Sequence, residues 1–107
     1  MSFDCTIQRH DGTVTVVPEG DISLETTSVM REVLRQVVES DTGDEIDVDM
    51  SAVTFLDSSG IGMLVAAQRA AGARGKTLLL SEPGPMIKMV LEIANLQDVL
   101  VRAPAAG

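Results

Sequence analysis

Residues 48–62 read VDMSAVTFLDSSGIG and decide the fold, because an apolar run typical of a strand changes here into an apolar run typical of a helix. Two adjacent hydroxyls, Ser58 and Ser59, follow the carboxylate of Asp57 at this junction. The first N–H groups of a helix lack backbone partners and lie at the positive end of the helix dipole, so the position favours an anion such as a phosphate. Asp and Ser are also ordinary N-cap residues, and on local sequence alone a capped helix is the simpler explanation.

Two glycines, Gly60 and Gly62, fall in the first turn of the expected helix. Each costs about 0.5–1 kcal/mol relative to alanine at such a position. Their presence predicts a close approach to this backbone, by a neighbouring strand or loop or by a docking protein.

The composition describes one small acidic domain. The chain has 107 residues, of which we expect 1–102 to form a single domain and 103–107 a disordered tail. Sixteen acidic and eight basic side chains give a formal charge of −8, which would repel a nucleic-acid backbone or an anionic lipid surface. One cysteine and one histidine are too few for a Cys/His metal site and exclude an internal disulfide.

The expected cellular location follows from the absence of a membrane-spanning run and of a secretory signal in this sequence. No run of eighteen apolar residues could span a bilayer, and the first residues have neither the basic start nor the apolar stretch of a secretory signal. We therefore expect a cytoplasmic protein with no membrane insertion, no nucleic-acid partner and no cofactor.

Strand and helix patterns alternate along the chain. A hairpin is expected from two β-branched runs around His10-Asp11-Gly12, followed by a loop over residues 18–21. The remaining expected elements are an amphipathic helix over 25–40, a strand over 45–50, a helix over 58–73, a strand over 77–80, a helix over 85–94 and a weak strand over 99–101.

This order predicts an α/β fold with a mixed four- to five-stranded sheet. The strict alternation of residues 45–50 places Glu45, Asp47 and Asp49 on one face, so the helices should lie mainly on the other face. The helix over 58–73 carries few polar groups and should be more buried than the helix over 25–40. Met63, Met86 and Met89 are expected in the core.

Catalytic patterns are weak. A serine hydrolase would need a base beside Ser58 or Ser59, and the G-x-S-x-G arrangement is absent. The pair Gly60 and Gly62 hints at a dinucleotide fingerprint, yet Val65 stands at the third glycine position. We therefore expect no catalytic residues and no metal ligands.

The chain resembles the anti-sigma factor antagonists of the STAS-domain family over nearly its whole length. The resemblance is carried by the segment VDMSAVTFLDSSGIGMLVAAQRAA, by the Gly20-Asp21-Ile22 loop, by Arg74-Gly75-Lys76 and by the helix around Met86 to Ala94. It implies a STAS-like sheet and a protein that binds a partner instead of turning over a substrate.

In this family the unphosphorylated antagonist captures an anti-sigma factor, commonly a serine kinase, and so releases the sigma factor. The kinase phosphorylates the first serine after the aspartate, which is Ser58 here, and a serine phosphatase reverses the modification. Ser59 is the alternative acceptor. The implied partner-binding residues are Asp21, Ser23, Asp57, Ser58, Ser59, Gly60, Ile61 and Gly62.

One residue departs from the family pattern. The loop after the hairpin often carries a second acid two residues beyond the first, and Ser23 occupies that place. This substitution puts the efficiency of phosphorylation in question. Two other functions stay open from the sequence: a non-catalytic STAS subunit of a lipid-transport ATPase complex or signalling scaffold, and nucleotide binding at Gly60 and Gly62.

Overall fold

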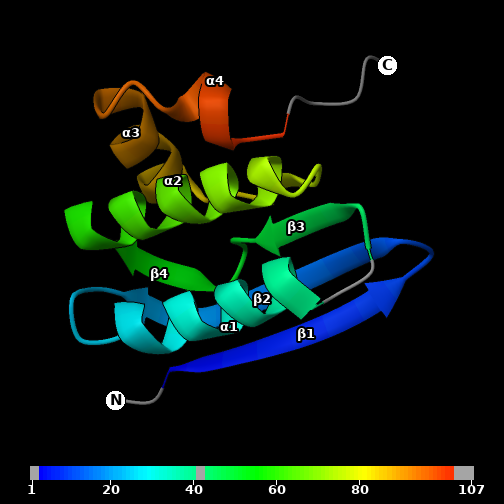
Figure 1. Ribbon diagram of the computed structural model, residues 1–107. Coiled ribbons are helices and arrows are strands. Elements are labelled where there is room, and N and C mark those ends of the chain that lie inside the picture. Colours follow the sequence, from blue (N-terminus) through cyan, green and yellow to red (C-terminus); the bar gives the residue numbers. More distant parts are fainter. Residues whose placement is uncertain (1–2, 41–42, 103–107) are drawn as a thin grey trace.

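A computed structural model describes residues 3–40 and 43–102 (Figure 1). Strands and helices alternate after an opening hairpin, as the sequence predicts. The elements are β1 (Asp4–His10), β2 (Thr13–Ile22), α1 (Thr27–Ser40), β3 (Glu45–Asp49), β4 (Val53–Leu56), α2 (Ser58–Ala73), β5 (Thr77–Ser81), α3 (Pro85–Ile93) and α4 (Gln97–Leu100).

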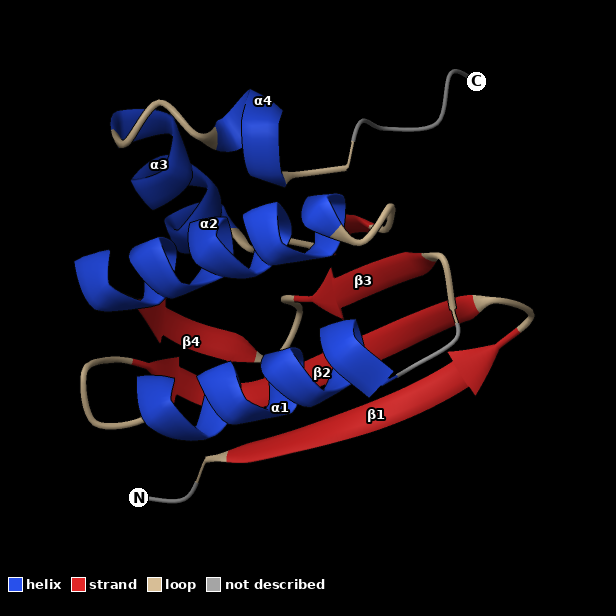
Figure 2. Ribbon diagram, viewed as in Figure 1, coloured by secondary structure: helices blue, strands red, loops and turns tan. Residues whose placement is uncertain are grey.

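The five strands form one mixed sheet. The order is β1-β2-β3-β5, and β4 pairs with the second half of β2. Among the strands of the described residues, β1 and β2 pair antiparallel, and the pairs β2–β3, β2–β4 and β3–β5 are parallel. Figure 2 shows α1 and α2 side by side over one face of this sheet, as expected for helices that follow parallel strands.

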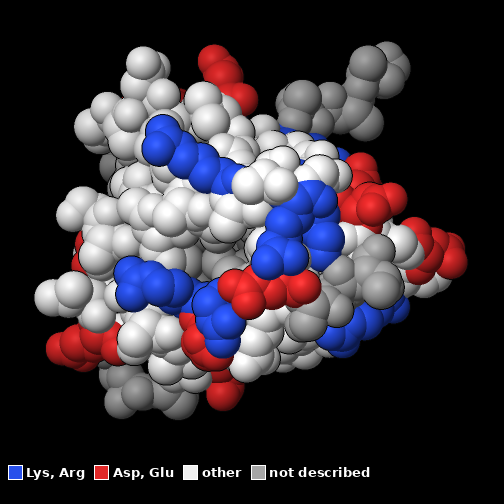
Figure 3. Space-filling view, in the orientation of Figure 1, with Lys and Arg blue, Asp and Glu red and all other residues white. Residues whose placement is uncertain are grey.

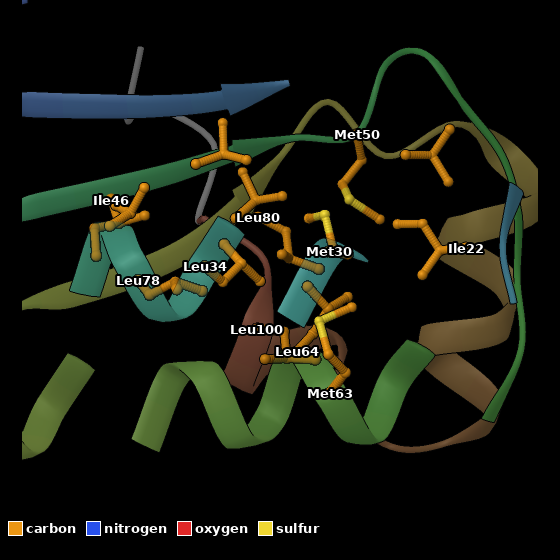
Figure 4. Close-up of a cluster of buried hydrophobic side chains, with 14 of the residues drawn as sticks. Ile22, Met30, Leu34, Ile46, Met50, Met63, Leu64, Leu78, Leu80 and Leu100 are labelled. Atoms are coloured by element: carbon orange, nitrogen blue, oxygen red, sulfur yellow. The ribbon is translucent and has the colours of Figure 1, made fainter. Parts of the chain in front are cut away.

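The core lies between the sheet and these helices. Alternate residues of β2, β3 and β5 are buried on the helix side, among them Ile46, Leu78 and Leu80 (Figure 4). Leu34 and Met30 from α1 and Leu64 from α2 meet them there. On the other face of β3, Glu45 is exposed, whereas Asp47 is half-buried and accepts a hydrogen bond from the Ser81 hydroxyl at 2.9 Å.

The sequence prediction for the second half of β2 is wrong. Residues 18–21 were expected to form a loop, but β2 continues through them to Ile22. Pro18 lies between Val16, the last residue paired with β3, and Gly20, the first paired with β4. A proline is tolerated at this change of partner because it lies outside both the β2–β3 and the β2–β4 hydrogen-bond ladders.

Two further elements differ from expectation. The run after Met50 is a separate strand, β4, because the chain turns at Ser51 and Ala52 and crosses to the far end of β2. The expected last strand over 99–101 is largely a helical turn, α4, and only Val101 forms a bridge, with Leu80. Residues 103–107, expected to be a disordered tail, lie outside the described residues.

Helix α2 begins and ends where the sequence predicts, at Ser58 and Ala73. Gly75, which follows the C-cap, has a left-handed backbone conformation and terminates the helix. Its N–H donates to the Gly72 carbonyl, and the Lys76 N–H donates to the Ala71 carbonyl. The expectation that α2 is more buried than α1 holds only in part: a smaller share of its residues is exposed, but fewer of them are fully buried, because several of its alanines and glycines face solvent.

The expectation for the methionines holds only in part. Met63 is buried, but Met86 and Met89 are about half exposed on α3. Among residues 3–40 and 43–102, no helix is both long enough and apolar enough to cross a membrane.

Candidate functional site

The candidate site lies where the carboxyl ends of β2 and β4 meet the start of α2, at the left of Figure 1. Ile22 and Leu56 are register partners in the two parallel strands. The Asp57 N–H extends this pairing by donating to the Ile22 carbonyl at 3.2 Å. The loop after β2 and the first turn of α2 are therefore neighbours.

Asp57 connects these two segments. Its Oδ1 accepts hydrogen bonds from the Gly60 N–H at 3.0 Å and from the Ser59 hydroxyl at 2.5 Å, which makes it the N-cap of α2. Its Oδ2 accepts from the Leu24 N–H at 3.2 Å. These donors, the Ser59 hydroxyl foremost, stabilise the charged form and lower the pKa of Asp57.

The two serines have different environments. The Ser59 hydroxyl is half-buried and donates to Asp57. Ser58 is exposed, and within the described part of the chain no residue hydrogen-bonds its hydroxyl. Ser58 is therefore the accessible hydroxyl at this helix start.

Asp21 and Ser23 lie in the adjoining segment. The Asp21 carboxylate is half-buried and accepts a hydrogen bond from the Thr54 hydroxyl of β4 at 2.5 Å. The Ser23 N–H donates to the Thr26 hydroxyl at 2.9 Å, and the Ser23 carbonyl accepts from the N–H groups of Thr26 and Thr27. Both residues thus shape the loop that leads from β2 to α1.

The residues after Ser59 divide by exposure. Gly60 is buried: an added Cβ would lie 2.6 Å from Leu56 Cδ1 and 2.8 Å from Ile22 Cγ2. Ile61 is half-buried, and Gly62 is exposed with nothing within 4 Å of an added Cβ. The close approach expected from the sequence is therefore made at Gly60 by the core itself, and Gly62 leaves open space beside Ser58.

Sequence reasoning missed the apolar surroundings of the site. Leu24, whose N–H binds Asp57, exposes 76% of its surface. Phe55 on β4, just before Asp57, exposes 43%. A leucine within the polar loop after β2 is the feature of the sequence that could have indicated this exposed apolar side chain.

No group of three or more potential metal ligands occurs among residues 3–40 and 43–102. The donors at the site are hydroxyls and backbone N–H groups around one carboxylate. This arrangement can present a hydroxyl for modification and can accommodate an anion at the helix start.

Comparison with known proteins agrees with this geometry. The family described as "Mlab, STAS domain" matches residues 5–102. The chain belongs to the STAS domain family.

Individual relatives of this STAS domain are distant but cover it almost completely. It is 26% identical to the anti-sigma-B factor antagonist of Staphylococcus epidermidis over 94% of this chain and 92% of that protein. The crystal structure of an anti-sigma factor antagonist from Mycobacterium paratuberculosis covers 98% of this chain and 88% of its own, with a TM-score of 0.85 and 25% identity. The Bacillus cell fate determinant SpoIIAA in its phosphorylated form covers 95% and 93%, with a TM-score of 0.71 and 18% identity.

The cap of α2 should contribute measurably to the stability of the STAS domain. We expect Asp57→Ala to lower the free energy of unfolding by about 1–2 kcal/mol, because the Gly60 N–H and the Leu24 N–H lose their acceptor. Urea denaturation followed by circular dichroism measures this change. A loss below about 0.3 kcal/mol would contradict the capping role, since N-cap substitutions typically cost about 1 kcal/mol.

Asp57 should also make stability depend on pH. Its pKa is lowered in the folded state, so its charge stabilises the fold above the unfolded pKa of about 3.9, and this contribution is lost as pH falls through the folded pKa. We expect the difference in unfolding free energy between wild type and Asp57→Asn to shrink as pH falls from about 5 to about 3. Urea denaturation of both proteins across this range tests it, and a difference that stays constant would contradict it.

Proposed function

We propose that this STAS domain is an anti-sigma factor antagonist that binds an anti-sigma factor serine kinase when Ser58 is unmodified. Capture of the kinase frees the sigma factor. Phosphorylation of Ser58 by the kinase ends binding, and a serine phosphatase restores it. The observation that carries this proposal is the exposed Ser58 hydroxyl at the start of α2, beside a neighbouring serine whose hydroxyl is bound to Asp57.

The relatives support the antagonist function. The similar proteins from Staphylococcus epidermidis and Mycobacterium paratuberculosis carry this description, and the similar Bacillus protein exists in a phosphorylated form. A chain with one cysteine and a formal charge of −8 suits the cytoplasm, where such a regulator would meet its kinase.

A phosphate on Ser58 would be compatible with the fold. It adds about −1.5 to −2 charges at the positive end of the α2 dipole, which favours an anion. Because Ser58 is exposed, the group can remain in solvent, and no core side chain needs to move.

The same phosphate would disrupt a partner that packs over this surface. The partner would cover the Ser58 hydroxyl, the open space beside Gly62 and the exposed Leu24 side chain. A doubly charged group would then be desolvated among apolar contacts, where its repulsion of the Asp57 carboxylate is also stronger than in solvent, and both effects cost binding free energy.

The acceptor can be identified with two matched variants. We expect the cognate kinase and ATP to phosphorylate wild type and Ser59→Ala, but not Ser58→Ala, as read by intact mass and phosphopeptide mapping. Modification of Ser59 in the Ser58→Ala variant at the wild-type rate would contradict the assignment.

The experiment also separates the antagonist from a non-catalytic STAS subunit of a larger assembly. Such a subunit would acquire no phosphate and would bind its partner equally well with Ser58→Ala and Ser58→Asp.

A further inference from the structure

A second surface feature lies away from the Ser58 site, in the groove between α1 and α2. The groove encloses about 220 Å³. Its apolar lining comes from Leu34 and Val38 of α1 and from Met63, Ala66, Ala67 and Ala70 of α2. The small alanine side chains leave this space open where larger residues would fill it.

The rim of the groove is basic, although the chain as a whole is strongly acidic. Among the described residues, Arg31, Arg35 and Arg74 line it together with one acid, Glu39. Figure 3 shows that basic side chains gather on the face formed by α1 and α2, around an uncharged stretch.

The three arginines differ in how they are paired. Arg35 binds Glu32 and also Glu39 at 2.9 Å, so it neutralises the one acid of the rim. Arg31 and Arg74 form no ion pair with any residue in the described ranges. Within the described part of the chain, the groove therefore offers two guanidinium groups without an ion-pair partner.

These two groups lie toward opposite ends of the groove. Figure 1 shows that α1 and α2 run in the same direction. Arg31 is in the second turn of α1, whereas Arg74 is the C-cap of α2. In an apolar trough with a cation at each end, a hydrocarbon chain can lie along the floor while its one anionic head pairs with the guanidinium at either end.

We propose that the α1–α2 groove binds an aliphatic carboxylate of medium chain length. A cavity of about 150 Å³ holds benzene, so this larger and more open groove suits a chain of roughly six to ten carbons. The hydrocarbon chain of the ligand contacts the alanines and Met63, and its carboxylate pairs with a guanidinium of the rim. Neither interaction involves Ser58, so an experiment that contradicts the groove proposal leaves the phosphorylation proposal unaffected, and the reverse also holds.

Octanoate is the probe, and amide resonances from NMR titration are the readout. We expect saturable shifts centred on Ala66, Ala67 and Ala70, and none with octyltrimethylammonium, whose cationic head meets Arg31 and Arg74. Shifts of equal size with the cation, or no saturable shift with octanoate, would overturn the proposal.

Matched variants test the two parts of the site. Ala70→Leu fills the groove and should weaken octanoate binding by about tenfold or more, whereas Ala73→Leu, exposed on α2 outside the lining, should not change it. The double variant Arg31→Gln/Arg74→Gln should weaken binding by about fivefold, and Arg69→Gln, also on α2 but outside the lining, should not. Equal affinity across the four proteins would overturn the proposal.

Two other occupants have distinct signatures. Co-sedimentation with phosphatidylglycerol vesicles that Ala70→Leu abolishes, without octanoate shifts, would assign the groove to a bilayer surface and overturn the free carboxylate. A dimer in analytical ultracentrifugation that Ala70→Leu dissociates would assign it to a second copy of the chain and overturn the proposal equally. The melting temperature of each variant verifies that it is folded.

Discussion

Ser58→Asp is expected to weaken binding of the cognate anti-sigma kinase by about two to three powers of ten, the equivalent of about 3–4 kcal/mol. The substitution places a carboxylate where the partner must exclude water, next to the Asp57 carboxylate and the exposed Leu24 side chain. Ser58→Ala removes only an exposed hydroxyl and should change the affinity by less than about threefold. Isothermal titration calorimetry with the purified kinase measures both values.

Ser51→Asp is the matched control. Ser51 is an exposed serine in the turn before β4, whereas Ser58 follows the other end of that strand, so the variant adds the same charge away from the proposed interface. It should bind as wild type does. Similar losses for both variants would mean that net charge, and not a charge at the start of α2, controls the interaction.

Gly60→Ala and Gly62→Ala should change stability in opposite directions, although the residues are two positions apart in one helix. A Cβ at Gly60 would meet Leu56 Cδ1, Ile22 Cγ2 and, at 3.1 Å, the Ile22 carbonyl oxygen. Leu56 and Ile22 are themselves buried and cannot turn away. We expect Gly60→Ala to lower the free energy of unfolding by about 1–2 kcal/mol, after allowing for the better helix propensity of alanine.

Gly62→Ala is the control for this prediction. A Cβ there meets nothing within 4 Å, so the variant should gain about 0.5–1 kcal/mol from helix propensity and reduced chain entropy. Chemical denaturation of the two variants gives both values. A Gly60→Ala protein as stable as Gly62→Ala would show that the strand ends do not press against α2 as described.

The parts of the fold that the sequence predicted are those set by local patterns. The bounds of α2 follow from Asp57 as N-cap and Gly75 as the left-handed residue after the helix, both within a few residues of the ends. The hairpin turn follows from Asp11-Gly12, where both residues have positive φ. The strand over residues 45–50 follows from its alternation.

The errors arise where distant segments decide the structure. Pro18 marks a loop in most contexts, but β2 passes through it because two different strands, β3 and β4, pair with its two halves. The outward face of α2 could not be predicted from composition, because alanines count as apolar whether or not they are buried. The groove between α1 and α2 could not be predicted either, because it depends on the packing of two helices that lie far apart in the sequence.

The candidate site shows the same division. Local sequence was enough to place Ser58 at the start of α2. It could not distinguish Ser58 from Ser59, because their difference depends on which hydroxyl Asp57 accepts. It also gave no sign that the loop after β2 is bound to α2 through Leu24 and Asp57, since these residues are 33 positions apart.

The central claim is that a negative charge on Ser58 removes the partner without unfolding the protein. The most direct measurement is the affinity of the kinase for the chain phosphorylated at Ser58, compared with the unmodified chain, with the melting temperature of each form recorded beside it. We predict an affinity lower by about two powers of ten or more and a nearly unchanged melting temperature. Equal affinity of the two forms, or a loss of binding that accompanies unfolding, would contradict the account.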